Sequence, residues 1–87
     1  MTAEKKSEAE LREIVLRILG EVAPDADTAA LEPDDDLRQR LDIDSMDHLN
    51  FVIGLHEATG IDIPERDYGK LTTVRSAVAY LGSRSKS

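Results

Sequence analysis

Hydrophobic residues recur at helical spacing in the first quarter of the chain. They fall three and four positions apart, at Leu11, Ile14, Val15, Ile18 and Leu19. Ser7, followed three residues later by Glu10, matches a capping box, and Gly20 is a typical helix stop. The pattern predicts an amphipathic helix that begins after Ser7 and ends at Gly20.

A polar segment, residues 21–36, follows this helix. It contains two prolines and several aspartates, which predicts a long irregular loop on the protein surface. Asp36 is a good N-cap for a short helical turn that would carry Leu37 and Leu41 back onto the core.

A second main helix is predicted from Ser45 to Thr59. Asp44 is a suitable N-cap, and Gly60 is a suitable C-terminal stop. Asp47 falls in the first turn, where a carboxylate interacts favourably with the helix dipole.

The apolar surface of this second helix is unusually wide. On a helical wheel it covers roughly 220°, about twice the arc that a surface helix needs. Its members are Met46, Leu49, Phe51, Val52, Ile53 and Leu55. Either the helix is covered on two sides, or the edge formed by Met46, Leu49 and Ile53, flanked by Asn50 and Glu57, stays exposed and receives partner proteins.

The remainder of the chain predicts one minor and one main helix. Residues 61–64 read as an extended connector, and residues 65–69 as one short helical turn that buries Tyr68. Thr72 or Thr73 can cap a last helix that ends at Gly82. Its expected inward face consists of Val74, Ala77, Val78 and Leu81.

These elements predict an all-α fold, a small bundle of three main helices plus one short helix, with a long loop between the first two main helices. No segment alternates as a strand does. The length of 87 residues fits a single domain. We expect the bundle to span residues 8–82, between a flexible N-terminus (1–7) and a flexible C-terminal tail (83–87).

Composition narrows the range of partners and compartments. The net charge is −7, and 13 of the 18 acidic residues lie in residues 1–44. This excess argues against nucleic acid as a partner and favours basic protein surfaces. The chain has no cysteine, no apolar run long enough to span a membrane and no secretory signal. We therefore expect a soluble cytoplasmic monomer.

Ser45 occupies the first position of the second main helix, where unpaired N–H groups and the helix dipole favour an attached anion. Asp44 and Asp47 bracket its hydroxyl and could hold a divalent ion for a second protein that transfers a phosphate-linked group. A capped helix that happens to begin with serine explains the same residues. The residues alone leave both interpretations open.

Three stretches together resemble the acyl carrier protein family. They are LDIDSMD at residues 41–47, IDIP at 61–64 and KLTTV at 70–74. The Asp-Ser-Met triplet resembles the family's attachment motif for 4′-phosphopantetheine. With the downstream motifs, the resemblance covers residues 8–82, and the motif context makes it specific.

The resemblance implies a free-standing carrier that performs no chemistry itself. A phosphopantetheinyl transferase would attach 4′-phosphopantetheine from coenzyme A to Ser45, and the cofactor's thiol would hold acyl groups as thioesters. The absence of cysteine is compatible with this, because the reactive sulfur arrives with the cofactor. Acyl-loading and acyl-using enzymes would dock through basic and apolar patches on a surface made of Asp44, Met46, Asp47, Leu49, Asn50, Ile53 and Glu57.

The second main helix departs from the family pattern. It carries Asn50 and His56 along a stretch that usually holds several acids, and Arg38 and Arg40 precede the attachment motif. We therefore expect a specialised carrier for fatty-acid, lipid or polyketide-type biosynthesis. A free-standing aminoacyl or peptidyl carrier, or a helical adaptor without cofactor, are the alternatives.

Two other interpretations are weak. Ser45 and His48 could act as nucleophile and base, but no orienting third group or oxyanion hole is evident, so we expect no enzyme and interpret His48 as a helix-surface residue. The aspartates at 34–36 and 42–47 lack the spacing of an EF-hand loop, so we expect no metal site.

Overall fold

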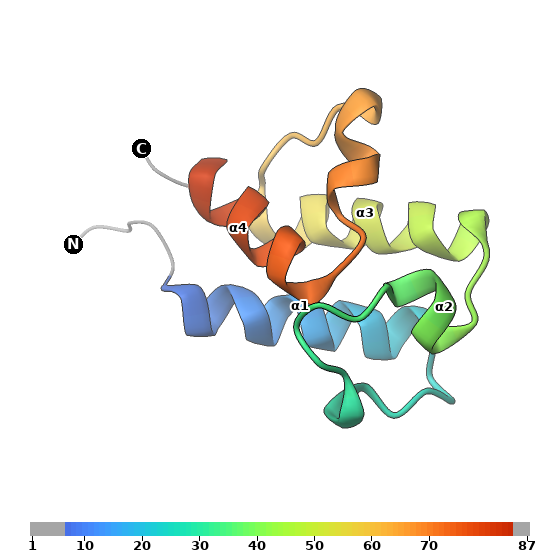
Figure 1. Cartoon of the computed structure of the whole chain (residues 1–87). Coiled ribbons are helices and arrows are strands. Elements are labelled where there is room, and N and C mark those ends of the chain that lie inside the picture. The colour runs from blue at the N-terminus through green and yellow to red at the C-terminus, as the bar shows by residue number, and fades with distance from the viewer. Residues whose placement is uncertain (1–6, 85–87) are drawn as a thin grey trace.

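The computed structural model of the chain describes residues 7–84 (Figure 1). These residues form only helices and connections, which confirms the predicted all-α fold. The elements in chain order are α1 (Glu8–Val22), η1 (Thr28–Ala30), α2 (Leu37–Leu41), α3 (Ser45–Thr59), η2 (Glu65–Lys70) and α4 (Val74–Arg84), where η marks a 3₁₀ helix.

The start of α1 has the predicted capping box. The Ser7 side chain accepts a hydrogen bond from the Glu10 N–H at 3.1 Å, and Glu10 Oε1 accepts one from the Ser7 N–H at 2.9 Å. The predicted end at Gly20 is wrong, because the helix continues to Val22. Val22 packs at the edge of the core, and this contact favours two further helical residues.

The loop between α1 and α3 carries two short helical pieces. The turn η1 lies within the segment predicted to be irregular, and α2 follows the predicted cap. Asp36 Oδ1 accepts hydrogen bonds from the N–H groups of Arg38 and Gln39, at 3.0 and 3.2 Å. Leu37 is fully buried, and its N–H donates to the carbonyl of Thr72 at 2.9 Å. This bond fastens the loop to the start of α4.

The core lies where α1 packs against both α3 and α4 (Figure 1). Its fully buried larger side chains are Leu11, Val15, Leu19, Leu37, Phe51, Val52, Leu55, Leu71 and Leu81. Gly54 of α3 is essential to the close approach of α1, because a Cβ there would stand 2.7 Å from Cγ2 of Ile18.

The region after α3 differs from expectation in its buried side chain. Asp67 is buried in η2, whereas Tyr68, predicted to be buried, is half-buried at the edge of the core. Burial of a carboxylate is tolerated here because Tyr80, Lys70 and Arg84 surround it with hydrogen-bond donors and positive charge.

The last helix has the predicted cap and inward face. Thr73 Oγ1 accepts a hydrogen bond from the Ser76 N–H at 3.0 Å, so Thr73 rather than Thr72 is the cap. Tyr80 is also buried. The helix does not end at Gly82 as predicted but reaches Arg84, and the Ser83 hydroxyl donates to the Tyr80 carbonyl at 2.8 Å.

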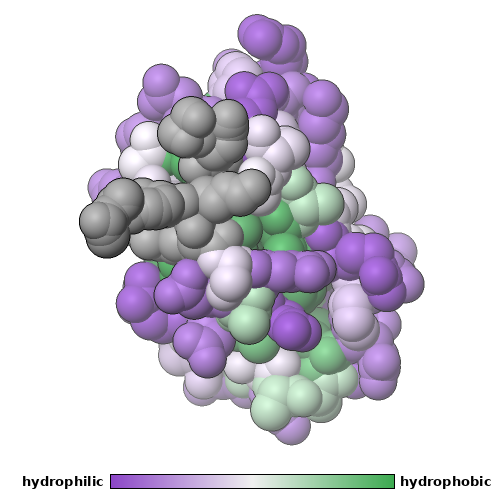
Figure 2. Space-filling model, turned by 90° about the vertical axis from the view of Figure 1, so that its left-hand side faces the viewer, coloured by the Kyte–Doolittle hydropathy of each residue, from purple (hydrophilic) through white to green (hydrophobic). Residues whose placement is uncertain are grey.

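The surface seen in Figure 2 is mostly hydrophilic, with hydrophobic residues visible between the polar ones near its centre. Among residues 7–84, no helix combines the length and the hydrophobicity that crossing a lipid bilayer requires.

Candidate functional site

Ser45 is placed by two adjoining helix boundaries. Asp42 ends α2 in the left-handed conformation, with φ of 55°, and Ile43 then turns inward and is buried. Asp44 begins α3, because its Oδ1 accepts a hydrogen bond from the Asp47 N–H at 2.9 Å. The end of α2 and the start of α3 are thus close together in the chain. They fix Ser45 as the first residue of α3.

The hydroxyl of Ser45 faces solvent at the N-terminal end of α3. Its side chain is exposed and makes no hydrogen bond to another residue in the range 7–84. The first N–H groups of a helix have no carbonyl partner within the helix. Here the Asp44 carboxylate accepts a hydrogen bond from one of them, the N–H of Asp47. The hydroxyl is therefore accessible from solvent, beside N–H groups and a helix dipole that stabilise a negative charge.

The apolar surface of α3 is divided between core and solvent. Phe51, Val52 and Leu55 are buried, whereas 62% of Met46 and 42% of Ile53 is exposed. Leu49 is half-buried between these two exposed residues, and Asn50 and Glu57 are exposed. The edge predicted for partner binding therefore lies open, and the rest of the wide arc is explained by core packing.

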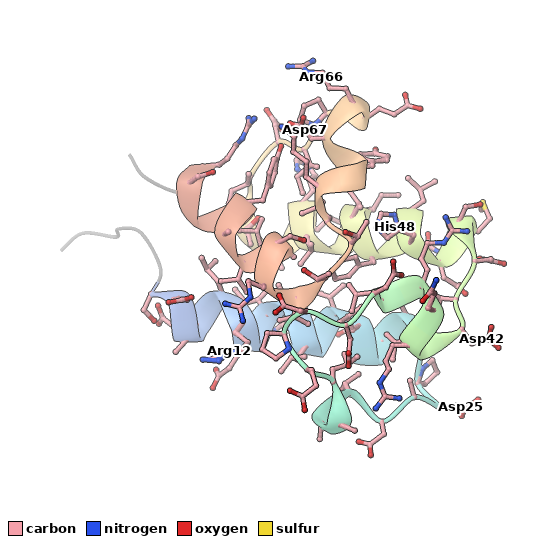
Figure 3. All side chains as sticks on the ribbon, viewed as in Figure 1. Arg12, Asp25, Asp42, His48, Arg66 and Asp67 are labelled. Atoms are coloured by element: carbon pink, nitrogen blue, oxygen red, sulfur yellow. The ribbon has the colours of Figure 1, made fainter. Side chains whose placement is uncertain are left out.

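His48 faces a main-chain carbonyl. Its Nε2 lies 3.0 Å from the Leu71 oxygen, and its ring is tilted against Phe51 with 6.1 Å between ring centroids (Figure 3). A carbonyl oxygen only accepts hydrogen bonds, so Nε2 carries the hydrogen. The interpretation of His48 as a plain surface residue is wrong: it is half-buried and joins α3 to the connection between η2 and α4.

His56, near the C-terminal end of α3, also contacts a main-chain carbonyl. Its Nδ1 lies 2.8 Å from the Ile61 oxygen, and 3.8 Å from Oδ1 of the exposed Asp62. Both histidines of the chain therefore hold carbonyls at the two ends of residues 61–71, which we call the 61–71 segment. This pair of contacts was not predicted, although the spacing of about two helical turns between His48 and His56 indicates that both lie towards the same side of α3.

Asp67 fixes the middle of the 61–71 segment to α4. Its Oδ2 lies 2.6 Å from the Tyr80 hydroxyl and 3.2 Å from Nη2 of Arg84, and its Oδ1 lies 3.3 Å from Nζ of Lys70. The hydrogen bond from Tyr80 and the nearby positive charges lower the pKa of Asp67, against the opposing effect of burial. Burial and the same hydrogen bond raise the pKa of Tyr80. Nothing in the local sequence indicates this cluster.

Two aspartates of the first long loop form ion pairs. Asp34 pairs with Arg75 across 2.7 Å, and Asp35 pairs with Arg40 across 3.2 Å. Within residues 7–84, no three carboxylate or imidazole groups are arranged to hold a metal ion.

Comparison with known proteins assigns the chain to a family. The family model described as "Phosphopantetheine attachment site" matches residues 9–81. The acyl carrier protein of Rubrobacter xylanophilus is 34% identical over 80% of this chain and 90% of its own length. The acyl carrier protein of Campylobacter hominis is also 34% identical, over 88% of this chain and 91% of its own.

A solved structure supports the same assignment. The structure of the acyl carrier protein from Enterococcus faecalis superimposes with a TM-score of 0.78 and 26% identity, over 92% of this chain and 100% of that one. On the family model, the two relatives and this fold, the chain belongs to the acyl carrier protein family, the phosphopantetheine-dependent and non-catalytic carriers.

Proposed function

We propose that Ser45 is the residue that carries 4′-phosphopantetheine. The observation that carries this proposal is the exposed Ser45 hydroxyl at the first position of α3, between two helix boundaries. The residues present fit the group: a phosphodiester on this oxygen lies at the positive end of a 15-residue helix. The bound cofactor supplies a terminal thiol, on which acyl groups are held as thioesters.

The chain's own contribution is to present this hydroxyl and to dock the enzymes that use it. Asp44 holds the first turn of α3 in place through its bond to the Asp47 N–H. The Asp47 carboxylate, one turn beyond Asp44, adds negative charge beside Ser45. A phosphopantetheinyl transferase requires Mg²⁺ near this hydroxyl, and carboxylates are the ligands that this ion prefers. Asp44 and Asp47 are therefore proposed to face that enzyme.

The docking surface for acyl-loading and acyl-using enzymes is proposed to run along α3. Exposed apolar side chains at Met46 and Ile53 offer contacts that are well suited to the centre of an interface. Leu49 lies between them, and Asn50 and Glu57 form the polar margin. Partners with apolar patches surrounded by basic residues complement this surface.

The cargo is proposed to be an acyl group of fatty-acid, lipid or polyketide-type biosynthesis, handled in the cytoplasm by a monomeric carrier. The thinned acidic character of α3, with Asn50 exposed and His56 turned to the Ile61 carbonyl, favours a dedicated set of partner enzymes. Arg38 is exposed in α2 and adds positive charge close to the attachment site. General fatty-acid enzymes are expected to use this carrier less efficiently than their own.

Intact-mass measurement tests the assignment of Ser45. The apo-protein is incubated with coenzyme A, Mg²⁺ and a promiscuous phosphopantetheinyl transferase. The wild-type chain is expected to gain one phosphopantetheinyl group, and Ser45→Ala to gain none. Ser83→Ala is the matched control, because Ser83 is also an exposed serine and should leave the gain unchanged. Modification of Ser45→Ala, or no modification of the wild type, would refute the proposal.

A further inference from the structure

His48 lies one helical turn from Ser45, near the start of α3. Its N–H donates to the Asp44 carbonyl at 3.0 Å, so the helix is regular between the cap and this residue. Side chains three positions apart on an α-helix are neighbours, with Cβ atoms about 5–6 Å apart. The His48 ring therefore lies beside the side chain that is proposed to carry the cofactor.

The ring of His48 is held in one orientation by two contacts. Its Nε2 donates to the Leu71 carbonyl across 3.0 Å, and the ring packs at a tilt against Phe51. Leu71 and Phe51 are both fully buried, so each contact ties the ring to the core of the bundle. A hydrogen-bonding group that is held in place before binding loses little conformational entropy when a ligand reaches it.

The second ring nitrogen of His48, Nδ1, has no hydrogen-bond partner among residues 7–84. Because Nε2 carries the hydrogen, Nδ1 of the neutral ring is an acceptor. In the same part of the chain, no side-chain nitrogen or oxygen is both sealed from solvent and without a partner, so Nδ1 is open to solvent. His48 thus presents a fixed and accessible acceptor one turn from Ser45.

We infer that Nδ1 of His48 accepts a hydrogen bond from the attached phosphopantetheine arm. This inference rests on the proposed function of Ser45. The part of the arm next to its phosphate carries a hydroxyl and then an amide N–H, and both are donors that suit a neutral acceptor. The neighbouring side chains Asp44 and Asp47 are carboxylates, which repel a phosphodiester, and Met46 is apolar. His48 is therefore the positioning residue that holds the arm against α3.

The same ring joins the arm to the 61–71 segment. Nδ1 accepts from the arm while Nε2 donates to the Leu71 carbonyl, and hydrogen bonds in such a chain strengthen one another. The position of the arm and the attachment of the segment are therefore coupled at His48.

Nitrogen NMR of the two histidine rings tests the contact directly. Spectra of the ¹⁵N-labelled protein are recorded above neutral pH, before and after loading with phosphopantetheine. On loading, the Nδ1 resonance of His48 should move part of the way towards that of an N–H nitrogen, and the resonances of His56 should stay in place. Ser45→Asp is the control for charge, because it places a negative charge at this position without an arm. The same shift in Ser45→Asp, a doubly protonated His48 ring after loading, or no shift at all would overturn the inference.

The mobility of the arm provides a second test. Pantetheine labelled with ¹³C is loaded onto the wild type, His48→Phe and His56→Phe, and its order parameters are measured by NMR relaxation. Both substitutions remove a ring that bonds to a main-chain carbonyl of the 61–71 segment, but only His48→Phe removes the acceptor beside Ser45. In the wild type and His56→Phe, the carbons next to the phosphate should be more ordered than those at the thiol end. In His48→Phe this difference should be lost, and an equal loss in His56→Phe would overturn the inference.

The outcomes separate this inference from the proposed function. If the intact mass of the wild type shows no added phosphopantetheine, the proposal for Ser45 fails and the inference fails with it. If the wild type is loaded and the Nδ1 resonance of His48 does not move, the proposal for Ser45 stands and the inference about His48 is overturned.

Discussion

The hydroxyl of Tyr80 donates a hydrogen bond of 2.6 Å to Oδ2 of Asp67, and both residues are buried. Arg84 reaches the same oxygen at 3.2 Å, and its guanidinium carbon lies 4.8 Å from the centre of the Tyr80 ring. A tyrosine, an arginine and an aspartate from two elements thus form one contact between η2 and α4. This contact makes the stability of the bundle depend on the ionisation of one carboxyl group.

The stability of the fold should depend on pH through Asp67. The hydrogen bond from Tyr80 holds the pKa of Asp67 below its ordinary value of 3.8. A lowered folded-state pKa contributes stability that is present above the unfolded value and is lost as the pH falls through the folded value. Thermal denaturation from pH 7 to pH 2 should therefore show an acid loss that Asp67→Asn reduces. Asp27→Asn, at an exposed residue, should retain the wild-type profile.

Two glycines within helices should respond to alanine in opposite directions. At Gly54 a Cβ would stand 2.7 Å from Cγ2 of Ile18, so α1 and α3 must separate, and we expect a loss of about 1–2 kcal/mol in unfolding free energy. At Gly20 nothing lies within 4 Å of the added Cβ, and we expect a gain of about 0.5–1 kcal/mol from helix propensity. Urea denaturation measures both. Equal effects of the two substitutions would contradict the close packing at Gly54.

His48→Phe should loosen one end of the 61–71 segment without unfolding the bundle. The substitution keeps an aromatic ring beside Phe51 but removes the donor to the Leu71 carbonyl. We expect faster amide hydrogen exchange at Asp67 in η2 and at Leu71 directly after it, whose N–H groups bond within the segment. Exchange in the middle of α1 should not change. Unaltered exchange in η2 would mean that the histidine contact does not hold the segment.

Ile53→Asp should impair docking while leaving the core intact. Ile53 is 42% exposed and does not belong to the buried core, so we expect its replacement to cost about 1–2 kcal/mol in unfolding free energy and to leave the bundle folded. Acyl transfer by a partner enzyme should fall about tenfold or more in kcat/KM, as expected for a residue at the centre of an interface. Glu13→Asp, an exposed change on α1, is the control. An Ile53→Asp variant loaded at the wild-type rate would remove α3 from the docking surface.

The elements that follow from local patterns were predictable from sequence. The capping side chains accept hydrogen bonds from N–H groups no more than three residues further along the chain, so a short stretch of sequence is enough to predict them. They belong to Ser7, Asp36, Asp44 and Thr73. The open edge of α3 also followed from the width of its apolar arc. Helix ends were less predictable, because contacts with the core extend α1 past Gly20 and α4 continues past Gly82.

Features that join distant parts of the chain were not predictable. Asp67 lies in a polar turn, and only folding brings Tyr80, thirteen residues away, to its carboxylate. His48 contacts a main-chain carbonyl 23 residues away. Because every residue has such a carbonyl, the sequence does not indicate which one accepts the hydrogen bond. The position of Ser45 at a helix tip was predicted, because its N-cap, Asp44, is its immediate neighbour in the chain.

The two histidine contacts have a consequence for how the 61–71 segment can vary. His48 and His56 form hydrogen bonds to main-chain carbonyl oxygens, and every amino acid residue has such an oxygen. These two hydrogen bonds are therefore independent of the side chains at Ile61 and Leu71, which contribute separately through packing in and against the core. Exposed residues between those ends, such as Glu65 and Arg66, can therefore change without loss of either histidine contact.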